Sequence, residues 1–147
     1  MTDRPYEMRT LDAAAYAGDL EAVRQYVVEG GDLEAISSGW DGNRTVLGIA
    51  AHQGYVEMVR FLLAHGANPN GPGQDRKRPL ENALWSANVE IVRMLLDHGA
   101  EVNMRNKNGD SALSWAGWYA RSNVVALLKS AGAKGQIKLN SRRPAER

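Results

Sequence analysis

Three histidines and no cysteine limit the chemistry that this chain can perform. Two of them, His65 and His98, each precede a Gly-Ala pair and lie 33 residues apart, so they hold the same position in two copies of one pattern. If the two copies pack side by side, their rings lie roughly 10 Å apart, which is too far for one metal ion. We therefore expect both rings to interact with carbonyl groups at helix ends, and we expect no metal and no cofactor.

Other patterns that carry catalysis are also missing from the sequence. There is no cysteine nucleophile and no Gly-x-Ser-x-Gly elbow. The stretch Gly71-Pro72-Gly73 lacks the Lys-Ser/Thr pair of a phosphate-binding loop, and the carboxylates are scattered along the chain. The sequence therefore does not predict an enzyme.

A period of 33 residues runs through most of the chain. Leu47 is followed at this spacing by Leu80 and Leu113. A first copy, which begins near Leu11, is shifted by 36 residues, and its three extra residues fall in the loop 36–43, where insertions cost little. The sequence therefore predicts a single domain over 1–147, made of tandem units and a basic tail. The units cover 10–36, 37–72, 73–105 and 106–134, and the tail covers 135–147.

Each unit has the pattern of a helix, a turn and a second helix. In the second unit Thr45 is placed to cap a helix, and Gly54 ends it. A second apolar stripe then follows at spacings of three and four residues, and Gly66 ends that helix. Apolar residues recur at equivalent positions of successive units, so we expect a continuous core shared by all of them.

These motifs resemble the ankyrin repeat family over about residues 10–134. The motif residues of the second unit are Thr45-Val46-Leu47, Ala50-Ala51, Gly54, Glu57-Met58-Val59, Leu62-Leu63 and Gly66-Ala67-Asn68-Pro69-Asn70. Those of the third are Pro79-Leu80, Ala83, Glu90-Ile91-Val92, Leu95-Leu96 and Gly99-Ala100-Glu101-Val102-Asn103. The resemblance implies an all-α solenoid of four helix-turn-helix units with β-turn or hairpin loops between them.

The chain departs from the family pattern at helix ends. Arg78 replaces the usual threonine, so that helix start lacks its hydroxyl cap. Ala87 and Ala120 stand where the second unit has Gly54, which costs about 1 kcal/mol each if φ is positive there.

One position varies between units and carries large rings. It follows the small inward-facing residues of each first helix, and in the resembled family it lines the concave groove that grips a partner. Four residues occupy it, namely Tyr16, His52, Trp85 and Trp118, and the next position carries Gln53, Ser86 and Tyr119. Exposed aromatic residues are common binding hot spots, so we expect this column to contact a partner. Trp115, in contrast, aligns with Ile49 and is expected in the core.

The tips of the turns between units carry mostly charged side chains that differ from one unit to the next. We expect them to select the partner through Trp40, Asp41, Arg44, Lys77, Lys107 and Asp110. Trp40 lies in the inserted loop and has no evident core to enter.

Charge and hydropathy narrow the classes of partner. The tail from Lys134 onward has five basic residues and Glu146, a net charge of +4, and the remainder of the chain has −3. A mildly acidic body is a poor general ligand for polyanions. Apolar runs are too short to span a membrane, and the first residues lack a secretory pattern, so we expect a cytoplasmic protein.

The leading hypothesis is a non-catalytic module that binds another protein through its groove, as a stoichiometric inhibitor, an immunity-type protein or an adaptor. In size the chain is similar to the small ankyrin inhibitors of cyclin-dependent kinases, and an immunity role rests on analogy with bacterial ankyrin proteins. One alternative is single-stranded nucleic-acid binding through the rings and the basic tail. Another is a self-associating scaffold, although we expect a monomer.

Overall fold

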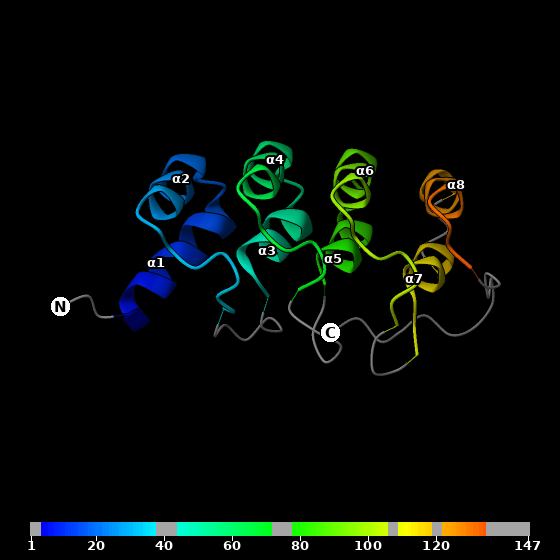
Figure 1. The fold of residues 1–147 in the computed structure, drawn as a ribbon, viewed down its shortest axis with the longest axis horizontal. Coiled ribbons are helices and arrows are strands. Elements are labelled where there is room, and N and C mark those ends of the chain that lie inside the picture. The colour runs from blue at the N-terminus through cyan, green and yellow to red at the C-terminus, as the bar shows by residue number, and fades with distance from the viewer. Residues whose placement is uncertain (1–3, 38–43, 72–77, 106–108, 119–121, 135–147) are drawn as a thin grey trace.

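The computed structural model describes residues 4–37, 44–71, 78–105, 109–118 and 122–134, without the side chains of residues 4–10 and 118. Within these ranges the chain forms helices joined in four consecutive pairs, which stand side by side in a row (Figure 1). The helices are α1 (Arg4–Ala17), α2 (Leu20–Val28), α3 (Val46–Gln53), α4 (Val56–Ala64), α5 (Pro79–Ser86), α6 (Val89–Asp97), α7 (Ala112–Trp118) and α8 (Ser122–Ser130).

The pairs form two layers. The first helices of the pairs, α1, α3, α5 and α7, lie in one layer, and the second helices, α2, α4, α6 and α8, lie in the other (Figure 1). We call these the inner and the outer helices. Antiparallel bridges join Ile36 to Thr45 and Arg105 to Ser111, so two of the connections between pairs have the start of a hairpin. The predicted all-α solenoid of helix-turn-helix units is confirmed.

Local capping explains where many of the helices begin and end. The Thr45 hydroxyl accepts a hydrogen bond from the Gly48 amide at 3.2 Å, as its position predicts. α5 has no side-chain cap at Arg78, which also agrees with the prediction. Gly54 ends α3 with φ of 80°, whereas Ala87 ends α5 in the same left-handed conformation with φ of 57°. The condition stated for a cost at Ala87, a positive φ, is therefore met, while Ala120 lies outside the described residues.

The core follows the period of the sequence. Leu47, Leu80 and Leu113 are all buried, and most of the alanines, valines and leucines at the other repeating positions are buried too, whereas Leu96, Ala100 and Val125 are half-buried. Trp115, expected in the core, is half-buried and packs against it at the last unit. The buried apolar residues of all four helix pairs make one cluster, and this shared core aligns the pairs.

A repeated side-chain bond also sets the spacing between units. The side-chain oxygens of Glu34, Asn70 and Asn103 accept hydrogen bonds from the backbone amides of the following units at 2.8 Å, and the three amides belong to Asn68, Glu101 and Lys134. The amide groups of Asn70 and Asn103 also donate to carbonyl oxygens at 3.0 and 3.1 Å. Glu34 has no N–H group to donate, so the first of these links lacks this second bond.

Candidate partner-binding face

The predicted ring column lies on the inner helices. Tyr16 belongs to α1, His52 to α3, Trp85 to α5 and Trp118 to α7. The residues that precede the first three in the chain, Ala15, Ala51 and Leu84, are buried in the core. One residue corresponds to about 100° of helix rotation, so the column is turned away from the core.

Exposure differs along the column. Trp85 is 44% exposed, and His52 and Tyr16 are half-buried. The Tyr16 ring packs against the core, and its hydroxyl oxygen is buried with no hydrogen-bond partner among the described residues. The side chain of Trp118 and the whole of Tyr119 lie outside the described residues. Trp85 is therefore the exposed ring of the described part of the column.

His52 and Trp85 form a stack across two units. Their ring centroids are 5.8 Å apart and their planes are inclined by only 7°. Because α3 and α5 are adjacent and the residues are equivalent, the rings lie parallel, and the separation of their centroids means that they are offset. The stack therefore fixes the orientation of the two rings relative to each other.

The second position of the column is used within the stack of units. The Ser86 hydroxyl donates to the Ala51 carbonyl oxygen at 2.9 Å, and the Gln53 amide donates to the Tyr16 carbonyl oxygen at 3.5 Å. Each of these carbonyl groups lies in the last turn of the inner helix of the preceding unit, where the helix has no further backbone N–H groups to donate to it. The Tyr55 hydroxyl also donates to the Tyr16 carbonyl oxygen, at 2.9 Å. These bonds join one unit to the next, a role that the sequence analysis did not anticipate.

The expectation of an exposed charge at Arg44 is wrong. Arg44 is only 5% exposed, because its backbone pairs with Ser37 beside the bridge that precedes α3. Arg44 therefore belongs to the buried part of the second unit and not to the exposed turn before it. Of the other turn-tip residues, Asp110 is half-buried, and the remainder lie outside the described residues, namely Trp40, Asp41, Lys77 and Lys107.

A buried polar group at the start of α5 escaped the sequence analysis. Arg78 is 4% exposed, its Nη1 lies 3.7 Å from Glu81 Oε1, and its carbonyl oxygen accepts a hydrogen bond from the buried Asn82 amide. The signal was in the alignment of the units, because Arg78 stands where the other units carry Thr45 and Ser111, and both of these are buried.

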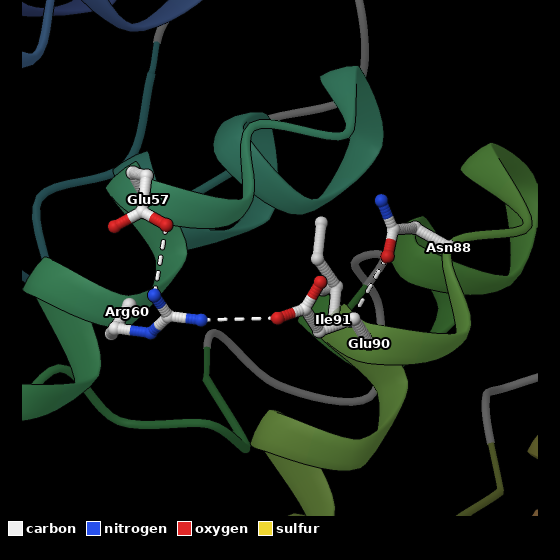
Figure 2. Close-up of polar contacts among 5 residues, drawn as sticks. All are labelled: Glu57, Arg60, Asn88, Glu90 and Ile91. Atoms are coloured by element: carbon white, nitrogen blue, oxygen red, sulfur yellow. Dashed lines mark hydrogen bonds and ion pairs between the residues drawn. The ribbon is translucent and has the colours of Figure 1, made fainter.

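The outer helices are joined by exposed ion pairs. Arg60 of α4 lies between Glu57 of its own helix, at 2.8 Å, and Glu90 of α6, at 3.0 Å (Figure 2). Asn88 caps α6 by accepting a hydrogen bond from the Ile91 amide at 3.1 Å. The charged side chains are all about half exposed or more, so these pairs contribute little to stability.

The two repeated histidines have the local role that their position predicts. His65 Nδ1 lies 2.8 Å from the Phe61 carbonyl oxygen, and His98 Nδ1 lies 2.8 Å from that of Met94. Both rings therefore bond carbonyl groups in the last turns of α4 and α6. Within the described ranges no group of three or more His, Asp or Glu side chains is arranged to hold a metal ion.

The helix pairs, their shared core and the bonds that repeat between them define a solenoid of helix-turn-helix repeats. The comparison with known families is specific: residues 11–106 match ankyrin repeats in three copies. The chain therefore belongs to the ankyrin repeat family.

Two mammalian relatives share part of this sequence. The chain is 36% identical over 72 residues to the mitochondrial liver isoform of glutaminase from Mus musculus, and 35% identical over 72 residues to that from Rattus norvegicus. Each match covers 48% of this chain but only 12% of the glutaminase. The likeness therefore concerns a small part of those enzymes.

None of the described helices is both long enough and apolar enough to cross a lipid bilayer.

Proposed function

We propose that this chain is a non-catalytic module that binds a partner protein across the inner helices, where the family resemblance places a concave groove. Ankyrin repeats generally mediate protein–protein interaction. A stack of repeats presents side chains on a continuous surface, and such surfaces serve recognition.

The exposure of Trp85 carries this proposal. A tryptophan that is 44% exposed leaves apolar area in water, and a partner that covers it gains the free energy of burying that area. Its ring is held in place by the stack on His52, so less conformational entropy is lost on binding than for a mobile side chain. Aromatic residues held in this way are typical centres of protein interfaces.

The simplest mechanism is stoichiometric. The module binds a surface of its partner and covers it, and it thereby inhibits, neutralises or tethers that partner. We favour a monomer acting in the cytoplasm, with a protein as partner, in preference to nucleic acid.

The experiment is capture of a partner by the purified chain, followed by titration of the purified pair. Trp85→Ala is expected to weaken binding by about 30-fold, the equivalent of about 2 kcal/mol. Val28→Ala is the matched control, because Val28 is 72% exposed but belongs to the outer helix α2. Equal affinities for the wild-type chain and the Trp85 variant, both folded, would show that the inner face is not the binding site.

A steep loss of oligonucleotide binding with added salt would instead support the nucleic-acid alternative.

A further inference from the structure

The last described residue, Lys134, is fixed to the stack by the repeated side-chain bond. The Lys134 amide donates to Asn103 Oδ1 at 2.8 Å, and the amides of Asn68 and Glu101 make the same bond one and two units earlier. After Asn68 the chain goes on to the start of α5, and after Glu101 it goes on to the start of α7. Lys134 holds the equivalent position in the fourth unit, so the distance from the basic segment to the ring column is counted from this fixed residue.

The residues beyond that point are basic and numerous enough to reach the ring column. Residues 135–147 carry Lys138, Arg142, Arg143 and Arg147 against Glu146, whereas the chain before Lys134 has a net charge of −3. Thirteen residues span up to about 43 Å when extended. Neighbouring units are about 10 Å apart, and Trp85 belongs to the unit before the last, so the distance is well within reach.

The ring column offers a guanidinium group a suitable surface. Trp85 is 44% exposed, and its ring is stacked on that of His52. Glu81, one helical turn before Trp85 on α5, is only 10% exposed and already lies 3.7 Å from Arg78, so the attraction comes from the ring itself. The chain already uses this chemistry elsewhere, since the Arg24 guanidinium carbon lies 4.7 Å from the centre of the Phe61 ring.

We propose that the basic segment 135–147 binds in cis to the ring column, with an arginine side chain covering Trp85, and competes there with the protein partner. This inference rests on the proposed function, because it takes the same face as the binding site. A short flexible connection gives an effective concentration of about a millimolar, so even weak binding of the free segment is enough to occupy the column.

The test uses the full chain and a synthetic peptide with the sequence of residues 135–147. In one variant Lys138, Arg142, Arg143 and Arg147 are replaced by alanine. NMR follows the indole N–H signal of Trp85, identified by its loss in Trp85→Phe. The alanine variant is expected to shift this signal, and the added peptide is expected to return it toward its original position with a Kd near or below about a millimolar.

Two controls isolate the contact. Arg93→Ala with Lys129→Ala removes exposed positive charge from outer helices and is expected to leave the Trp85 signal unchanged. Binding of a fluorescently labelled peptide, measured by anisotropy because Trp85→Ala removes the Trp85 signal, is expected to weaken at least tenfold when Trp85→Ala is added to the alanine variant, whereas Val28→Ala has no effect. An identical Trp85 signal in the wild-type chain and the alanine variant overturns the proposal, and so does peptide binding that is independent of Trp85.

The partner assay separates the two proposals. If the segment competes, the alanine variant binds the protein partner several-fold more tightly than the wild-type chain. If Trp85→Ala abolishes partner binding but the alanine variant binds as the wild type does, the proposed function stands and the competition in cis is wrong. If the peptide binds at Trp85 but no protein binds either chain, docking of the segment stands and the proposed function fails.

Discussion

Replacing Ala87 by glycine should stabilise the protein, although it removes a methyl group. Ala87 ends α5 with φ of 57° and ψ of 27°, a left-handed conformation. The equivalent residues of the two preceding units are Gly18 and Gly54, with φ of 74° and 80°. In this conformation the Cβ atom lies too close to the backbone, so alanine is strained where glycine is not.

The size of the gain follows from two opposing terms. The left-handed conformation costs a residue with a Cβ about 1–2 kcal/mol. Glycine loses about 0.4–1 kcal/mol more conformational freedom on folding than alanine does. The difference predicts a gain of about 0.5–1 kcal/mol in the free energy of unfolding, which raises the Tm of a chain of this size by about 1–4 °C.

Urea unfolding followed by circular dichroism measures this gain. Ala126→Gly is the control, because Ala126 is exposed in the middle of α8 and the same chemical change there should cost about 1 kcal/mol. Gly54→Ala is the reverse change and should also destabilise the protein. A lower unfolding midpoint for Ala87→Gly would refute the reasoning, since it would mean that the strain of the left-handed alanine is smaller than the entropy term.

Substitutions at three further positions test the hydrogen-bonding groups described above, each by urea unfolding. Asn70→Asp keeps the oxygen that accepts from the Glu101 amide but loses the N–H that donates to the Gly99 carbonyl oxygen, so it should lower the free energy of unfolding by about 1 kcal/mol. Asn70→Ala loses both bonds and should lower it further. Equal losses for the two variants would contradict this double role. Ser86→Ala should cost about 1 kcal/mol by removing the hydroxyl that bonds the Ala51 carbonyl oxygen, and an unchanged stability would argue against this link. Tyr16→Phe should raise the stability by about 1 kcal/mol because the buried hydroxyl lacks a partner, and a loss would show that it has one.

Much of the fold could be predicted because the sequence repeats itself. The recurrence of Leu47, Leu80 and Leu113 identifies equivalent residues, and equivalent residues of a stack meet the same surroundings. The cap at Thr45 and the positive φ at Ala87 follow from backbone requirements that act within a few residues. Such features are local, so the sequence contains what is needed to predict them.

The candidate face was harder to predict because exposure depends on the neighbouring unit. Arg44 was expected at an exposed turn, but the bridge between Ile36 and Thr45 places it inside the stack. The repeat pattern places Ser86 next to Trp85 in the column. It does not show that the Ala51 carbonyl oxygen of the preceding unit lies within hydrogen-bond distance of Ser86. Both depend on contacts between units.

This difference between the two positions of the column decides which substitutions report on binding. Trp85 and His52, at the first position, contact each other across two units through their stacked rings. Gln53 and Ser86, at the second position, donate to carbonyl groups of the preceding unit. A weaker complex after a change at the second position therefore reflects altered packing between units as well as lost contacts. A substitution of Trp85, the exposed ring, leaves in place the side chains that make those hydrogen bonds, so it is the clearer test of a binding site.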